Sequence, residues 1–183
     1  MIGWVNNWTY GNQIPTSPWR SAMSLPRELS LARTSAGIVL QQKLVGLENL
    51  RGEKIASIEK EKFNGPFELT ATLSEETAVE LFTDAGDRLV ISYVEGTVSA
   101  DRVKTKTDFH PDFASVESYE VPGYPATVKV RLVVDQSIAE VFINDGLGVI
   151  TEQFYFQQPA IKVKSAGDVK ITEGYHLKSV WGK

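Results

Sequence analysis

The chain has 183 residues, of which 42% are hydrophobic and 10% aromatic, a composition typical of one globular domain with or without a short appendage. Its 19 basic and 23 acidic residues give a formal net charge of −4, so it lacks the positive charge excess that nucleic acids and anionic membranes attract. Without cysteine, and with only two histidines, disulfides, thiolate chemistry and histidine-rich metal sites are excluded. We therefore expect no nucleic-acid or membrane partner, no metal and no cofactor.

No segment reaches the ~18 consecutive apolar residues that a membrane-spanning helix needs. The first ten residues have neither the basic start nor the sustained apolar run of a secretory signal. The chain is therefore expected to carry no signal peptide, and its compartment stays open.

The first thirty residues differ in composition from the rest, because they contain three of the four tryptophans and three of the eight prolines. Apolar residues over 2–10 predict a strand, and turn formers over 11–18 predict a polar loop. Residues 23–31 are expected to be extended, since Pro26 disfavours helix at the residue before it. These thirty residues are therefore expected to stand apart from the domain that follows.

From residue 33 onward, short runs in which apolar and polar residues alternate follow one another, as is typical of half-buried strands. The runs cover residues 38–42, 69–73, 79–83, 89–94, 128–134, 138–143, 149–156, 161–164 and 169–172. Only 44–50 favours a helical turn, and 108–125, with three prolines, is expected to form the longest loop. Many short strands and no long amphipathic helix predict an all-β antiparallel sandwich or barrel.

The strongest two strand runs come just before Asp145-Gly146, a dipeptide that signals a hairpin turn between strands. Four apolar residues on these runs are predicted to be core residues. They are Leu132, Val134, Val141 and Phe142.

Acid–base catalysis by paired carboxylates requires that the two groups face each other across a cleft. The acidic residues that could serve are scattered along the sequence. The candidate pairs are Asp84/Asp87, Glu75/Glu76 and Asp108/Asp112. All three pairs lie in turns or polar loops, where acidic residues are common for solubility and turn geometry. His110 is expected in a loop and His176 on a sheet surface, and no motif for a serine nucleophile, a phosphate or zinc occurs. No catalytic residue is predicted.

Trp4 and Trp8 lie four residues apart, so on a strand their rings would share a face. Exposed rings of this kind can stack against sugars, whereas the alternative is that they pack in a core or an interface. Because burying apolar area is favourable, the first thirty residues are expected either to pack on the following domain or to drive self-association.

Residues 3–29 read GWVNNWTYGNQIPTSPWRSAMSLPREL and contain Asn-Trp-x-Tyr, Pro-Thr-x-x-Trp-Arg and Pro-Arg-Glu-Leu. This segment strongly resembles glycoside hydrolase family 32, which contains levanases, inulinases, invertases and related β-fructofuranosidases. Further matches to family patterns are Glu140-Val141-Phe142, Asn144-Asp145-Gly146 and, more weakly, Ala100-Asp101-Arg102 followed by Phe109 and Phe113. Gln136 stands where the family usually has Arg.

In that family the first segment closes the last blade of a five-bladed catalytic propeller and leads into a C-terminal β-sandwich. The resemblance implies that residues 1–30 are the remnant of that blade with its linker, and that residues 31–183 form a β-sandwich of two antiparallel sheets. The motifs with the family's Asp nucleophile, second Asp and acid/base Glu do not occur here. The chain is therefore expected to be the C-terminal piece of such an enzyme, inactive alone.

The resemblance also implies a function. We expect a non-catalytic domain that mainly supports the catalytic propeller of a retaining enzyme acting on fructan or sucrose. The alternative is a carbohydrate-binding module that binds fructan on its own. Expected partners are the propeller, a second copy through the sandwich, and the substrate through the intact enzyme. Trp8 matches a family Trp at the edge of the fructose pocket, and is the one predicted substrate-binding residue, in the intact enzyme only. The preferred fructan and the choice between chain ends and internal bonds stay open.

Overall fold

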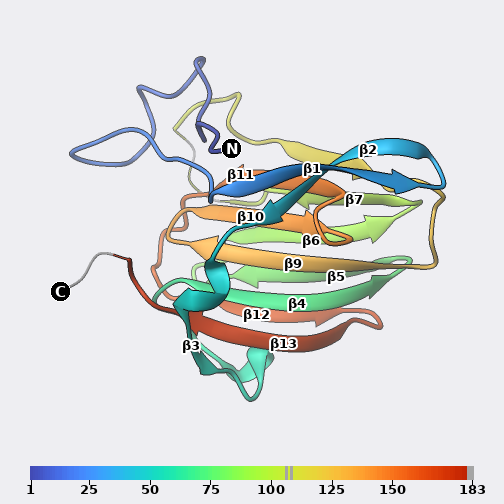
Figure 1. The fold of residues 1–183 in the computed structure, drawn as a ribbon. Coiled ribbons are helices and arrows are strands. Elements are labelled where there is room, and N and C mark those ends of the chain that lie inside the picture. Colours follow the sequence, from blue (N-terminus) through green and yellow to red (C-terminus); the bar gives the residue numbers. More distant parts are fainter. Residues whose placement is uncertain (106, 108, 181–183) are drawn as a thin grey trace.

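Two antiparallel sheets lie face to face and make up most of the structure, as Figure 1 shows. This computed structural model describes residues 1–105, 107 and 109–180. The six-stranded sheet has the order β11 (Gly148–Gln153), β10 (Ile138–Ile143), β9 (Thr127–Asp135), β4 (Phe67–Ser74), β13 (Lys170–Leu177) and β3 (Arg51–Lys54). The five-stranded sheet has the order β12 (Lys162–Ala166), β5 (Thr77–Phe82), β6 (Arg88–Val94), β7 (Thr97–Asp101) and β8 (Val116–Glu120). The all-β sandwich of two antiparallel sheets is confirmed.

A two-stranded hairpin and two short 3-10 helices complete the described elements. The hairpin consists of β1 (Arg27–Thr34) and β2 (Gly37–Leu44), and lies along the end of the sandwich where β11 borders the larger sheet (Figure 1). The helices are η1 (Leu47–Leu50) and η2 (Ile58–Lys60), and η1 falls where a helical turn is predicted. Within the described ranges, no helix has the length and hydropathy that crossing a membrane requires.

Each of the strand runs predicted from residue 33 onward overlaps a strand of the structure, whereas β3, β7 and β8 are not predicted. The prediction of one long loop over 108–125 is wrong, because β8 lies inside it and pairs with β7. β8 has the sequence Val-Glu-Ser-Tyr-Glu, is mostly exposed and borders its sheet. An exposed edge strand does not need the apolar alternation by which strands are recognised.

The core lies between the two sheets. Leu132, Val134 and Val141 are at most 1% exposed and belong to it, as predicted. Phe142 is also buried, but it lies outside this core. Successive strand residues face opposite sides, so Phe142 lies on the outer face of its sheet, with the Arg27 guanidinium 5.2 Å from its ring centroid. The burial predicted for all four residues is confirmed, although Phe142 is buried on the outer face of its sheet and not between the two sheets.

The outer face of β4 also differs from the prediction. Alternation in this strand predicts that Glu68 and Thr70 face solvent, yet they are only 1% and 8% exposed. Glu68 is covered by the side chains of Arg51 and Arg131, both of which donate hydrogen bonds to its carboxylate. A strand with one charged face can therefore be buried on both sides.

Residues 1–26, the N-terminal segment, form an irregular loop that returns on itself, so the strand predicted over 2–10 is wrong. Its two ends meet in an isolated antiparallel bridge between Trp4 and Met23. The chain turns soon after this bridge, because the side-chain oxygen of Asn7 accepts the backbone N–H two residues further on, at 2.9 Å. Such local hydrogen bonds compete with strand pairing.

The predicted hairpin at Asp145-Gly146 is confirmed, since it joins β10 to β11. Gly146 has a φ of 87°, and a Cβ atom there would lie 1.9 Å from the carbonyl oxygen of Gln42. The backbone N–H of Gln42 donates to the Gly146 carbonyl at 2.8 Å. Glycine thus permits strand β2 to lie directly against this turn.

Candidate functional site

Residues from the sequence motifs meet where the N-terminal segment joins the sandwich. Glu140 on β10 accepts the backbone N–H of Leu25 at 2.6 Å and forms an ion pair with Arg27. Arg27 also donates to Thr151 Oγ1 on β11 at 2.7 Å and to Gln42 Oε1 on β2 at 3.0 Å. One guanidinium therefore ties the start of β1 to three other strands.

This first anchor, Arg27 with Glu140, is buried, with side chains 7% and 3% exposed. Removing one partner of a buried ion pair leaves an uncompensated charge and typically costs about 3–5 kcal/mol. The pair therefore makes the position of the N-terminal segment sensitive to a single side chain.

A second anchor is centred on Arg102, which follows β7. Its Nη2 donates to the hydroxyl of Tyr10 at 3.0 Å, and its Nη1 donates to the Gln153 carbonyl at 3.1 Å. The guanidinium lies 4.4 Å from the ring centroid of Phe113. Around it, a second apolar cluster holds the N-terminal segment by Tyr10 and Ile14, which are 4% and 2% exposed. The other members of the cluster are Phe113 and Tyr155, with Phe109 packed against them.

Glu152 on β11 lies beside the second anchor, with one carboxylate oxygen 2.9 Å from Nη1 of Arg102. The residue is 1% exposed. Burial raises the pKa of Glu152 to about 8, against the attraction of Arg102 and with a smaller contribution from Glu117. A carboxyl group with this pKa carries a proton at neutral pH for most of the time.

A cavity of about 400 Å³ lies at the same junction. Its walls come from residues 1–10 of the N-terminal segment on one side and from β11 on the other, with Arg27 and Arg102 contributing from the two anchors. This volume lies within the range of small-molecule sites.

The predicted substrate-binding residue, Trp8, is 91% exposed. Its ring lies 5.0 Å from that of Trp4, whose indole N–H donates to Ser21 Oγ at 2.7 Å. Trp4 and Trp19 are 42% and 73% exposed, so the burial of the segment does not involve these two tryptophans. Of the two expected outcomes, packing on the following domain is the one seen, through Tyr10 and Ile14. Smaller residues of the segment, Val5 among them, are buried instead.

The structure does not assemble the candidate carboxylates into one site. Asp84 is half-exposed and lies 2.5 Å from Lys162 Nζ. Asp87 is fully buried and accepts hydrogen bonds from Thr83 Oγ1 and the Gln157 backbone N–H, at 2.9 and 3.0 Å. The expectation of a solvated loop is therefore wrong for Asp87, which shapes a turn. Glu75 accepts a hydrogen bond from the backbone N–H of Glu95, in the turn between β6 and β7, and Glu76 has a φ of 59° in the turn between β4 and β5.

Asp112 is exposed beside His110, which lies in a loop as predicted, and Asp108 lies outside the described residues. His176 lies on β13, 3.8 Å from Glu61, with 40% of its side chain exposed. Among the described residues, no group of three metal-ligating side chains comes together.

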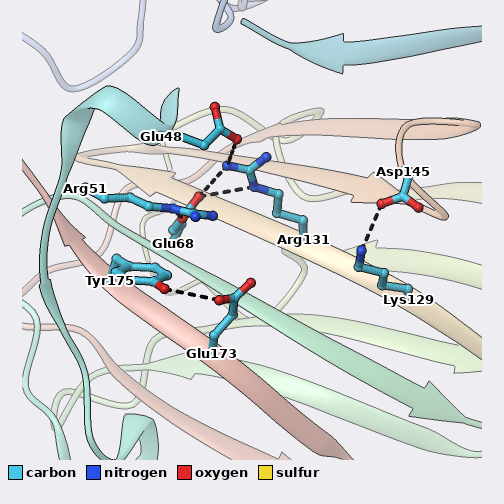
Figure 2. Close-up of polar contacts among 8 residues, drawn as sticks. All are labelled: Glu48, Arg51, Glu68, Lys129, Arg131, Asp145, Glu173 and Tyr175. Carbon is cyan, nitrogen blue, oxygen red and sulfur yellow. Dashed lines mark hydrogen bonds and ion pairs between the residues drawn. The ribbon is translucent and has the colours of Figure 1, made fainter. Parts of the chain in front are cut away.

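A third polar cluster lies on the outer face of the six-stranded sheet (Figure 2). Glu68 binds Arg51 and Arg131, and Glu48 of η1 lies 3.0 Å from Nη2 of Arg131. The Arg51 guanidinium lies 4.4 Å from the ring centroid of Tyr175. These charges are paired with one another, so the cluster joins η1 and β3 to the neighbouring strands. Few of its charged groups are left to bind a ligand. Sequence reasoning misses it, since its members come from five separate elements.

Comparison with known proteins gives the family. The sequence model "Glycosyl hydrolases family 32 C terminal" matches residues 31–179, and the N-terminal domain model of the same family matches residues 1–43. The chain belongs to glycosyl hydrolase family 32. A levanase of Bacillus subtilis (strain 168) is 31% identical over 99% of this chain, and an extracellular exo-inulinase of Aspergillus ficuum is 29% identical over 98%.

Solved structures of family 32 have the same fold. The crystal structure of exo-inulinase from Aspergillus awamori superposes with a TM-score of 0.81 and 26% identity, covering 98% of this chain and 40% of that one. The chain spans 31% of the levanase and 39% of the exo-inulinase from Aspergillus ficuum, about a third of their length. It corresponds to the family's C-terminal domain together with the end of its N-terminal domain.

Proposed function

We propose that this chain is the non-catalytic C-terminal part of a fructan- or sucrose-hydrolysing enzyme, and that its sandwich holds the last segment of the catalytic propeller in place. The observation that carries this proposal is the pair of anchors. Arg27 and Tyr10 belong to the motifs at the start of the chain, and their partners Glu140 and Arg102 belong to motifs of the sandwich. The residues that carry the family resemblance thus bind one another.

The proposal includes a division of the chain at residue 30, with residues 1–30 as the end of the last propeller blade and its linker and residues 31–183 as the sandwich. The N-terminal domain model matches up to residue 43, so the two family models overlap over residues 31–43, the second half of β1 and most of β2. In the intact enzyme, Trp8 would stand at the edge of the fructose pocket. Its exposed ring supports this role, because such a side chain is available to a ligand or to another part of the enzyme.

Amide hydrogen exchange on the whole chain tests the anchoring role, with Glu140→Gln as the variant and Glu28→Gln, an exposed residue of β1, as the control. Breaking a buried pair costs about 3–5 kcal/mol, and each ~1.4 kcal/mol is a factor of ten. We expect exchange in residues 1–26 to become at least tenfold faster in Glu140→Gln, with β4 and β9 unchanged. Equal protection of the segment in both variants, or uniform loss through both sheets, would contradict the proposal.

We further propose that the hairpin β1–β2 contacts the propeller. Leu29, Leu31, Ile38 and Leu40 share one face of the hairpin, and each is 44–75% exposed. An aliphatic row in water is typical of an interaction surface. Light scattering decides between the propeller and a second copy: a monomer favours the propeller, whereas a dimer that Leu31→Lys dissociates favours self-association through the sandwich.

The second candidate function is binding of fructan by the chain itself. The cavity beside Glu152 favours it, because its lining is polar and some buried polar atoms of the lining residues have no hydrogen-bond partner.

A further inference from the structure

Two dipeptides of the chain carry a side-chain carbonyl group next to a glycine, a combination that can react with its own backbone. The backbone nitrogen of the glycine attacks the side-chain carbonyl carbon of the preceding residue, and the lack of a Cβ atom makes glycine the least hindered attacker. The chain contains one Asn-Gly pair, Asn64-Gly65, and one Asp-Gly pair, Asp145-Gly146. The structure places these two pairs in different surroundings.

The Asp145-Gly146 pair is held by contacts on both reacting groups. The Gly146 N–H donates to the Ile143 carbonyl at 3.0 Å, so its nitrogen is engaged in the turn between β10 and β11. One carboxylate oxygen of Asp145 lies 2.9 Å from Lys129 Nζ, and an ionised carboxylate is a poor target for a nucleophile. We therefore expect this pair to remain unmodified.

The Asn64-Gly65 pair forms an exposed bend between Phe63, which pairs with Ile161 in an isolated bridge, and strand β4. Among the residues that the structure describes, none forms a hydrogen bond with the Asn64 side chain or with the Gly65 N–H. A Cβ atom on Gly65 would meet no atom within 4 Å apart from its chain neighbours, so the space around this backbone is open. Both reacting groups can therefore approach each other.

We propose that Asn64 is a site of spontaneous deamidation in the folded protein, since asparagine is among the thermolabile residues. Hydroxide removes the Gly65 N–H proton, and the nitrogen attacks Cγ of Asn64. The new N–Cγ bond closes a cyclic imide as the Cγ–Nδ2 bond breaks, and the side-chain nitrogen takes a proton from water and leaves as ammonia. Water then opens the imide, so that the net reaction consumes one water and releases one ammonia.

The imide can open in two ways, and the products differ in the course of the main chain. Cleavage of the new N–Cγ bond gives aspartate, with the original backbone. Cleavage of the bond between the Gly65 nitrogen and the Asn64 backbone carbonyl carbon gives isoaspartate, whose main chain runs through Cβ and is one carbon atom longer.

The extra carbon atom falls in a turn whose two ends are fixed. Before the turn, Phe63 and Ile161 exchange two backbone hydrogen bonds, at 2.8 and 2.9 Å. After the turn, the ring of Phe67 on β4 stacks on that of Phe63 with their centroids 3.8 Å apart, and both rings are buried. A close-packed interior responds to a change of one methylene group. Isoaspartate should therefore loosen the start of β4, whereas aspartate should not.

The test is ageing of the whole folded chain at mildly alkaline pH, followed by tryptic digestion and mass spectrometry with fragmentation that separates isoaspartate from aspartate. The tryptic peptides 63–88 and 132–162 separate Asn64 from the turn at Asp145-Gly146. We expect first-order conversion of Asn64 to a mixture of both products, at least tenfold faster than any change at Asn144 or Asp145.

Two variants identify the attacking nitrogen and the target. Gly65→Ala is the matched variant, because its methyl group would meet open space, and it should slow the conversion at least tenfold without a change in the urea midpoint. Asn64→Gln, whose longer side chain would have to close a larger ring, should abolish the conversion and serves if Gly65→Ala folds poorly. Asn64→Asp supplies the aspartate product directly. It should unfold at the same urea concentration as the wild type, and the isoaspartate form of the aged chain at a lower one.

An intact Asn64 in the folded chain, after a time in which the urea-unfolded chain is converted, would show that the bend is protected and would overturn the proposal. Conversion of Gly65→Ala at the wild-type rate would overturn the attack by the Gly65 nitrogen, and an earlier reaction at Asp145 would overturn the selectivity. Equal urea midpoints for the isoaspartate and aspartate forms would overturn the expected loosening of β4. The anchoring role is measured separately, by the exchange of residues 1–26 in Glu140→Gln.

Discussion

Glu152 should make the stability of this domain fall as the pH rises. Its carboxyl is buried, and its pKa is raised from the usual 4.5 to about 8. Between these two values the folded chain keeps a proton that the unfolded chain releases, so unfolding becomes more favourable as the pH increases. In Glu152→Gln the side chain stays neutral throughout, and this contribution to the pH dependence disappears.

The size of the effect follows from the two pKa values. Each pKa unit corresponds to about 1.4 kcal/mol, so the rise to about 8 sets an upper bound of about 5 kcal/mol on the change between pH 4.5 and 8. Within this upper bound, we expect a change in unfolding free energy of at least about 1 kcal/mol.

Urea denaturation of both proteins at pH 5, 6, 7 and 8 (roughly the window in which a raised carboxyl titrates) measures this difference. The unfolding free energy of the wild type minus that of Glu152→Gln should decrease steadily across the series. Glu117→Gln should have an intermediate effect, because it removes the negative charge that, together with burial, raises the pKa of Glu152. A difference that stays constant, or that grows with pH, would show that Arg102 keeps Glu152 ionised and would refute the reasoning.

Three further predictions concern single features. Phe142→Ala should cost about 3–5 kcal/mol in a denaturation experiment and also accelerate amide exchange in β1, because the ring supports Arg27; an unchanged midpoint would contradict its burial. Trp8→Ala should change stability by less than about 0.5 kcal/mol, since the ring is 91% exposed, and a loss above about 1 kcal/mol would indicate a hidden contact. The isolated chain should release no fructose from sucrose, inulin or levan above a buffer blank, because it lacks the family motifs for covalent catalysis and for proton transfer, the latter alone contributing about 10²–10⁴-fold.

Local sequence patterns are sufficient for most strands of this protein. An alternation of apolar and polar residues locates β4 and β9, and Asp145-Gly146 locates the hairpin between β10 and β11, because side-chain direction and turn conformation depend on neighbours in the chain. The same rules fail for β8, an exposed edge strand whose stability comes from its partner β7. They also fail after Trp4, where an asparagine side chain ends the strand pattern.

The family motifs identify which residues matter, but their partners are a property of the fold. Arg27 and Glu140 are 113 positions apart, and Tyr10 and Arg102 are 92 apart, so no local pattern pairs them. Burial of a charged residue such as Glu68 or Glu152 depends on what covers the outer face or the edge of a sheet, and that cover comes from distant segments. The strands follow from the order of residues along the chain, whereas the two anchors and the cavity exist only because the closed sandwich brings the N-terminal segment against β10 and β11.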